Sequence, residues 1–96
     1  MTEIPPAFDY RYIIVGKSTC PFSIHCVDYC KVRTFQYIFL DYIGNGEILQ
    51  EYKEYYDQER LPIVLANNLE TGYTKKVGDY NDLLRFTECQ KKKQKT

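Results

Sequence analysis

Short apolar runs rich in β-branched residues alternate with longer helix-type segments, and this alternation restricts the possible folds more than any other feature. The runs at 11–16 and 37–41 (Arg-Tyr-Ile-Ile-Val-Gly and Tyr-Ile-Phe-Leu-Asp) predict two buried strands. Two further runs, at 63–66 and 73–77, are separated by turn-forming residues. This spacing predicts a closing β-hairpin.

Three other segments predict helices. The first opens at Cys20-Pro21, because proline is favoured at the first helical position, and extends to about Val32. The second begins at Glu47 with apolar and tyrosine side chains at helical spacing, and the third covers 80–89. The order β-α-β-α-β-β-α predicts an α/β fold with a four-stranded mixed sheet and helices on both faces.

The 96 residues are enough for one small domain. We expect a loose leader over 1–9, a globular domain over 10–89 and a basic tail over 90–96. Thirteen Lys and Arg balance thirteen Asp and Glu, which argues against a nucleic-acid or membrane partner. The first residues lack the features of a signal peptide, so we expect a cytoplasmic monomer with free thiols.

Cys20 is the residue that most directly suggests chemistry. It lies at a strand-to-helix junction, where unpaired backbone N–H groups and the helix dipole favour a thiolate. Lys17 adds positive charge nearby. Such surroundings lower a thiol pKa from about 8.5 to roughly 3.5–7.5. Cys20 is therefore predicted to be a nucleophile, and the alternative is a buried, inert cysteine.

Three motifs in this chain resemble those of the glutaredoxin family, which has the thioredoxin fold. In chain order they are Lys17-Ser-Thr-Cys20-Pro-Phe-Ser23, similar to the family's Lys-x-Thr-Cys-Pro-Tyr-Cys; Leu61-Pro62, similar to its Val-Pro with a cis proline; and Gly78-Asp79-Tyr80-Asn81-Asp82-Leu83, similar to its Gly-Gly-x-x-Asp-Leu. The resemblance covers about 12–86, nearly the whole globular part.

The resemblance implies a glutathione-dependent thiol–disulfide oxidoreductase. Glutathione would be its co-substrate, and glutathionylated proteins or small disulfides would be its partners. Cys20 would be catalytic, with Pro21 and Ser23 in supporting positions. The residues implied to bind glutathione are Lys17, Phe22, Leu61, Pro62, Gly78, Asn81 and Asp82.

Each implied contact has a physical reason. Lys17 would hold the glycyl carboxylate as a point charge. The backbone of Leu61, beside a cis Pro62, would pair with the glutathione cysteine like an added strand. The γ-glutamyl carboxylate would lie at the start of the third helix, where N–H groups are unpaired, and Asp82 would take the γ-glutamyl ammonium.

The chain departs from the family pattern at three positions. Ser23 replaces the second active-site cysteine, so the motif cannot close a disulfide and a one-thiol mechanism is implied. Asp79 replaces the second glycine; it could cap the third helix, and its charge would also weaken γ-glutamyl binding. Arg60 precedes Leu61 and could compensate that charge.

Two other functions remain open at this point. Single-thiol relatives with Cys-Gly-Phe-Ser bridge an iron–sulfur cluster with the help of glutathione, although Pro21 is usual in members that hold no cluster. The other alternative is a redox-silent interaction protein that keeps the frame without turnover, which Asp79 favours.

Several nearby residues have competing interpretations. Ser23 is either a helix-surface residue or a hydrogen-bond partner of the Cys20 thiolate. Cys26 and Cys30 are expected in the core, with a resolving thiol or a zinc site as rivals. Cys89 is a possible resolving thiol, and His25 is expected to face solvent. No metal site is predicted, and the Tyr52, Tyr55 and Tyr56 stripe is expected to be core and rim packing.

Overall fold

The computed structural model describes residues 6–93, and the side chains of residues 8–87. Its elements in chain order are η1 (Pro6–Asp9), β1 (Tyr10–Gly16), α1 (Pro21–Arg33), β2 (Gln36–Asp41), α2 (Gly46–Tyr55), β3 (Ile63–Asn68), β4 (Thr74–Gly78) and α3 (Tyr80–Lys93). Every predicted helix and strand is present, with bounds that shift by a few residues.

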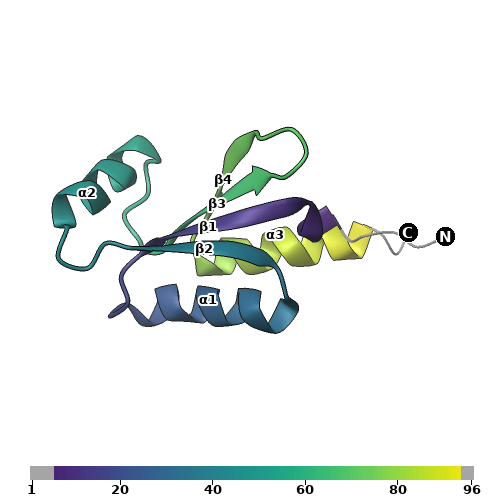
Figure 1. Cartoon of the computed structure of the whole chain (residues 1–96), viewed down its shortest axis with the longest axis horizontal. Helices are drawn as coiled ribbons and strands as arrows, with labels where there is room; N and C mark the ends of the chain where they lie inside the picture. Colours follow the sequence, from purple (N-terminus) through teal and green to yellow (C-terminus); the bar gives the residue numbers. More distant parts are fainter. Residues whose placement is uncertain (1–5, 94–96) are drawn as a thin grey trace.

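The strands form one mixed sheet in the order β2-β1-β3-β4. β1 and β2 are parallel, and β3 is antiparallel to both β1 and β4. α1 and α3 lie along one face of this sheet, and α2 lies toward one end on the other side (Figure 1). The predicted α/β fold class is therefore confirmed, and the arrangement is thioredoxin-like at a coarse level.

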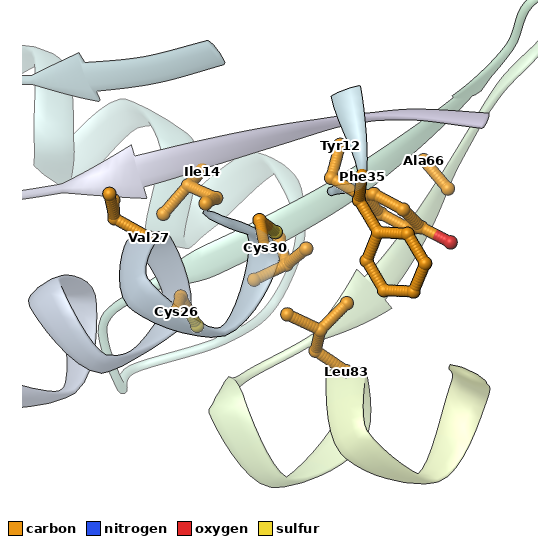
Figure 2. Close-up of a cluster of buried hydrophobic side chains, with 9 residues drawn as sticks. Tyr12, Ile14, Cys26, Val27, Cys30, Phe35, Ala66 and Leu83 are labelled. Carbon is orange, nitrogen blue, oxygen red and sulfur yellow. The ribbon is translucent and has the colours of Figure 1, made fainter. Parts of the chain in front are cut away.

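The main core lies between the sheet and the pair α1 and α3. Alternate residues of a strand point to opposite faces, so Tyr12 and Ile14 of β1 both face this core. α1 contributes Cys26 and Cys30, and α3 contributes Leu83, all fully buried (Figure 2). This packing places α1 against β1 and sets the position of the α1 N-terminus.

A smaller core lies on the opposite face of the sheet. Val15 of β1 packs there with Ile63 and Leu65 of β3, and Leu49 of α2 covers them. This second core anchors α2 and the loop that leads into β3 to the sheet.

The expectation that the 37–41 strand is buried was wrong. β2 is an edge strand whose residues are all exposed or half-buried, and Ile38 is 42% exposed. A strand at the edge of a sheet has a neighbour on one side only, so apolar composition alone does not bury it.

The chain before β1 is also more ordered than the predicted loose leader. Pro6–Asp9 forms a turn of 3-10 helix, and the Phe8 ring packs edge-to-face on Phe35 at 4.8 Å. The Leu69 N–H donates to the Asp9 carbonyl at 2.9 Å. Residues 1–5 of the predicted leader lie outside the described residues.

α3 extends to Lys93, into the segment predicted as a basic tail, of which 94–96 lie outside the described residues. Leu83 is its fully buried anchor, whereas Leu84 and Phe86 are half-buried. Among the helices described over residues 6–93, none has the length and apolar character needed to cross a bilayer.

Candidate functional site

The β1–α1 junction presents Cys20 at the N-cap of α1. Cys20 has an extended backbone (φ −90°, ψ 118°), Pro21 takes the first helical position, and the Cys20 side chain is partly exposed. The Cys20 N–H donates to the Lys17 carbonyl at 3.0 Å, which closes the loop after β1. Cys20 is therefore not buried, unlike the cysteine of the alternative interpretation.

The carboxylate of Asp41 ties this loop to the neighbouring strand. One of its oxygens accepts the backbone N–H of Ser18 at 3.0 Å and that of Ile43 at 3.2 Å. The Ser18 N–H bond holds the pKa of Asp41 below its usual range. Asp41 ends β2 directly opposite Gly16 in the parallel pair. Sequence reasoning assigned Asp41 no role, because nothing in its local pattern shows the loop that it contacts.

The pKa of the Cys20 thiol is lowered by its position. Partial burial raises this pKa, but hydrogen bonding from the backbone N–H and hydroxyl of Ser23 and the N–H of Phe22, together with the charge of Lys17, outweighs burial. The neutral thiol makes no regular capping bond. We therefore infer that the Ser23 and Phe22 donors stabilise the Cys20 thiolate when it forms. The predicted shift toward thiolate is confirmed in direction.

Ser23 lies behind the cysteine and is fully buried, so its reading as a helix-surface residue was wrong. Its hydroxyl accepts the Lys17 backbone N–H at 3.4 Å. A Cβ added at Gly16 would come within 2.2 Å of this hydroxyl oxygen and 3.6 Å of the Pro62 Cβ. Ser23 is thus enclosed by the end of β1 and the segment before β3.

The Leu61–Pro62 peptide bond is cis, as the resemblance implied. Pro62 is fully buried and Leu61 is half-buried. The Gln58 side-chain amide donates to the carbonyls of Arg60 (2.7 Å) and Pro62 (2.9 Å), so it clamps this segment from both sides of Leu61.

A small hollow of about 50 Å³ lies between the first turn of α1, this segment and the start of α3. Its lining residues are Phe22, Arg60, Leu61, Asp79, Tyr80 and Asn81. Three of these, Phe22, Leu61 and Asn81, were predicted to bind glutathione. Lys17, Pro62, Gly78 and Asp82 were also predicted to bind it and do not line this hollow.

Aromatic rings form one wall of the hollow. Phe22 is 55% exposed, and its ring lies 6.5 Å from that of Tyr80. His25 is exposed, as predicted, but its ring also lies 5.7 Å from Tyr80 and 6.1 Å from Phe22. Tyr80 belongs to the third motif, but sequence reasoning gave it no role. Its ring neighbours, Phe22 and His25, come from a different helix, α1.

Two carboxylates already cap the start of α3. The Asp79 N–H donates to Asp82 Oδ2 and the Asp82 N–H donates to Asp79 Oδ1, both at 3.0 Å. This reciprocal pair is a capping box, so the prediction that Asp79 caps the helix is confirmed. Gly78 has φ 130°, and a Cβ there would lie 2.1 Å from Asp82 Oδ2. Glycine is therefore required for the close approach of Asp82.

Asp82 has two partners of its own near the start of α3. One of its oxygens accepts the Asp79 N–H and the other contacts the Arg85 guanidinium. The Asp79 N–H bond and the Arg85 charge hold the pKa of Asp82 below its usual range. Both oxygens have a partner within the protein, and the expected role of Asp82 toward an ammonium group stays a prediction. Arg60 lies 3.7 Å from Asp79 Oδ2, where it partly offsets that charge as expected.

Cys26 and Cys30 are buried core thiols, as predicted. Burial raises the pKa of Cys26 well above the ordinary range and that of Cys30 to about 12. Across the part of the chain that the structure describes, no group of three His, Cys, Asp or Glu side chains is placed to hold a metal ion. The Cys89 side chain lies outside the described residues, so its role as a resolving thiol stays a prediction.

No protein-family model matches this sequence, and the search of curated proteins finds no relative. A partly exposed sulfur and donors that favour its anion provide what a nucleophilic thiol requires. The small hollow is lined by Phe22, two residues after Cys20, and not by Cys20 itself.

Proposed function

We propose that this protein is a glutaredoxin-like, glutathione-dependent thiol–disulfide oxidoreductase that works through the single thiol of Cys20. The observation that carries the proposal is the partly exposed Cys20 sulfur, whose pKa is lowered at the N-terminus of α1. The buried Ser23 hydroxyl supports the anion but cannot form a disulfide.

The reaction would proceed in two exchanges. The Cys20 thiolate attacks the glutathione sulfur of a glutathionylated protein, a Cys20–glutathione disulfide forms, and the protein thiolate leaves and takes up a proton. The thiolate of a second glutathione then attacks the glutathione sulfur bound to Cys20. Glutathione disulfide leaves, and the Cys20 thiolate is restored. The protein–glutathione mixed disulfide and one glutathione thiol thus give a protein thiol and glutathione disulfide, so one disulfide bond replaces another.

Several residues support glutathione as the co-substrate. Lys17 would attract the glycyl carboxylate, and the backbone of Leu61 would pair with the peptide of glutathione. Phe22 would flank the sulfur, and Asn81 lines the same hollow. The γ-glutamyl carboxylate would meet a helix start that Asp79 already caps, so we expect weak binding at this end. Glutathionylated proteins or small disulfides would be the partners, and a reducing cytoplasm would supply the glutathione.

A second candidate is a redox-silent interaction protein with the same frame. The specific observation in its favour is the pair of carboxylates, Asp79 and Asp82, at the start of α3. If these groups exclude glutathione, Cys20 would be reactive without a co-substrate.

The test is reduction of a glutathionylated peptide by glutathione, compared for the natural protein, Cys20→Ser and Cys89→Ser. Treatment with glutathione disulfide should leave one glutathione on Cys20, identified by mass spectrometry of the peptides. We expect Cys20→Ser to abolish turnover and Cys89→Ser to retain most of it. Wild-type activity in Cys20→Ser would overturn the mechanism. Calorimetry showing no binding of glutathione would instead favour the redox-silent protein.

A further inference from the structure

A second, larger hollow lies on α2, away from the residues proposed to bind glutathione. It has a volume of about 440 Å³, and we call it the tyrosine groove. Its lining residues are Tyr42, Ile48, Glu51, Tyr52, Tyr55 and Tyr56. The sequence predicted core and rim packing for the tyrosines of this helix. Tyr52 and Tyr56 are half-buried and pack against the smaller core, as predicted, whereas Tyr55 is 81% exposed.

The rings of the tyrosine groove present π faces at different angles. Tyr42 and Tyr52 have ring centroids 5.9 Å apart, and Tyr52 and Tyr56 are nearly parallel at 6.3 Å. Tyr55 stands at 82° to Tyr56, with centroids 4.7 Å apart. The face of an aromatic ring carries negative potential, so a cluster of such rings attracts cations.

The charge around the tyrosine groove has one predominant sign. Glu51 is the one charged residue among those that line it. The segment 41–59 contains six Asp or Glu residues and a single lysine, although the whole chain is neutral. A cationic ligand would therefore meet both π faces and the Glu51 carboxylate in the groove.

Within the described part of the chain, no lysine or arginine makes a cation–π contact with a tyrosine ring of the groove. Arg33 lies over Tyr29, and Lys75 lies over Tyr10 and Phe86, at 5.0–5.4 Å from the ring centroids. None of these three rings lines the tyrosine groove. Lys76 reaches Tyr56, but its Nζ donates to the backbone carbonyl at 2.7 Å.

We propose that the tyrosine groove binds a lysine or arginine side chain on a basic segment of a partner protein. The cation would lie against the tyrosine faces, and Glu51 would neutralise its charge. The groove starts at Tyr42, directly after Asp41, and Asp41 is paired in register with Gly16 at the end of β1. A bound segment would therefore lie at the same end of the parallel strand pair as the Cys20 loop. The proposal concerns binding alone and does not depend on the chemistry of Cys20.

The experiment measures binding of a fluorescein-labelled Gly-Arg-Gly-Arg-Gly peptide by fluorescence anisotropy at low salt, with Gly-Glu-Gly-Glu-Gly as the matched control peptide. Tyr55→Leu keeps an apolar side chain but removes the π face, and Glu51→Gln removes the charge. We expect each variant to weaken arginine-peptide binding by about two- to fivefold, and Tyr55→Leu/Glu51→Gln by about tenfold.

Tyr73→Leu is the control variant, because Tyr73 is 70% exposed but lies on the β3–β4 connection outside the tyrosine groove. We expect it to bind the arginine peptide like the natural protein. Circular dichroism checks that each variant is folded. Equal binding of the arginine peptide by the double variant and the natural protein would overturn the proposal. Failure of the natural protein to prefer the arginine peptide over the glutamate peptide would overturn it as well.

Discussion

The backbone of Gly16 and the side chain of Ser23 are in direct contact where β1 leads into α1. A Cβ at Gly16 would lie 2.2 Å from the Ser23 hydroxyl oxygen and 3.0 Å from the Ser23 Cβ. The same hydroxyl accepts the Lys17 N–H and contributes to lowering the Cys20 pKa. The missing side chain at Gly16 therefore makes room for the group that supports the thiolate.

Gly16→Ala should disrupt this arrangement. The added methyl group must displace the Ser23 hydroxyl, and overpacking of this kind costs about 1–3 kcal/mol. We expect a lower free energy of unfolding in urea and a Cys20 pKa closer to its ordinary value. Gly46→Ala is the matched control, because nothing lies within 4 Å of a Cβ at Gly46. Equal stability of the two variants would contradict the contact.

Ser23→Ala should raise the Cys20 pKa without adding bulk. The variant removes the hydroxyl that favours the thiolate and leaves the backbone donors of Phe22 and Ser23 in place. Loss of one such hydrogen bond should slow alkylation of Cys20 at neutral pH by about two- to tenfold. The measurement is the rate of iodoacetamide labelling, and an unchanged rate would show that the hydroxyl has no electrostatic role.

Cys26 and Cys30 should resist alkylation in the folded protein. Burial raises both pKa values, so these thiols stay protonated at pH 7 while Cys20 reacts. Peptide mapping after brief labelling should find Cys20 modified and Cys26 and Cys30 modified only after denaturation. Rapid labelling of Cys30 in the native state would contradict the described core.

The same buried thiols predict how stability depends on pH. Their pKa values are raised on folding, so their contribution is fully present below the unfolded thiol pKa near 8.5. Above that pH the unfolded chain loses these protons first, and the free energy of unfolding should fall toward pH 12, near the Cys30 pKa. Cys30→Ala should be less stable at pH 7 but lose less stability on going to pH 10. Parallel pH profiles would contradict the shift.

Asp79 should have opposite effects on stability and on glutathione binding. Asp79→Ala removes the cap of α3 and should cost about 0.5–2 kcal/mol, whereas Asp79→Asn keeps an acceptor for the Asp82 N–H. Both variants remove a negative charge beside the hollow, so both should bind glutathione more tightly in calorimetry. If neither variant gains affinity, Asp79 does not oppose the γ-glutamyl carboxylate.

The sequence predicted well what depends on local pattern. The apolar runs and Pro21 placed β1, the loop and Cys20 at the start of α1, since these signals act over a few residues. The burial of Ser23 was not predictable in this way. It depends on Gly16 and on Pro62, which is far along the chain and reaches the junction only when β3 pairs with β1.

Three other features could not be predicted in full, for similar reasons. The composition of β2 does not reveal its place at the edge of the sheet, which follows from strand order. Asp79 and Asp82 have the spacing of a capping box, but the resemblance did not show the reciprocal bonds that their carboxylates make. The helical spacing of the α2 tyrosines predicted packing and could not show that Tyr55 stays exposed.

The most direct test is the pH dependence of Cys20 alkylation in the Cys89→Ser protein, where the other two cysteines are buried. The rate should rise with pH and reach half its plateau below the ordinary thiol pKa of about 8.5. A midpoint at or above that value would contradict a thiolate stabilised at the start of α1.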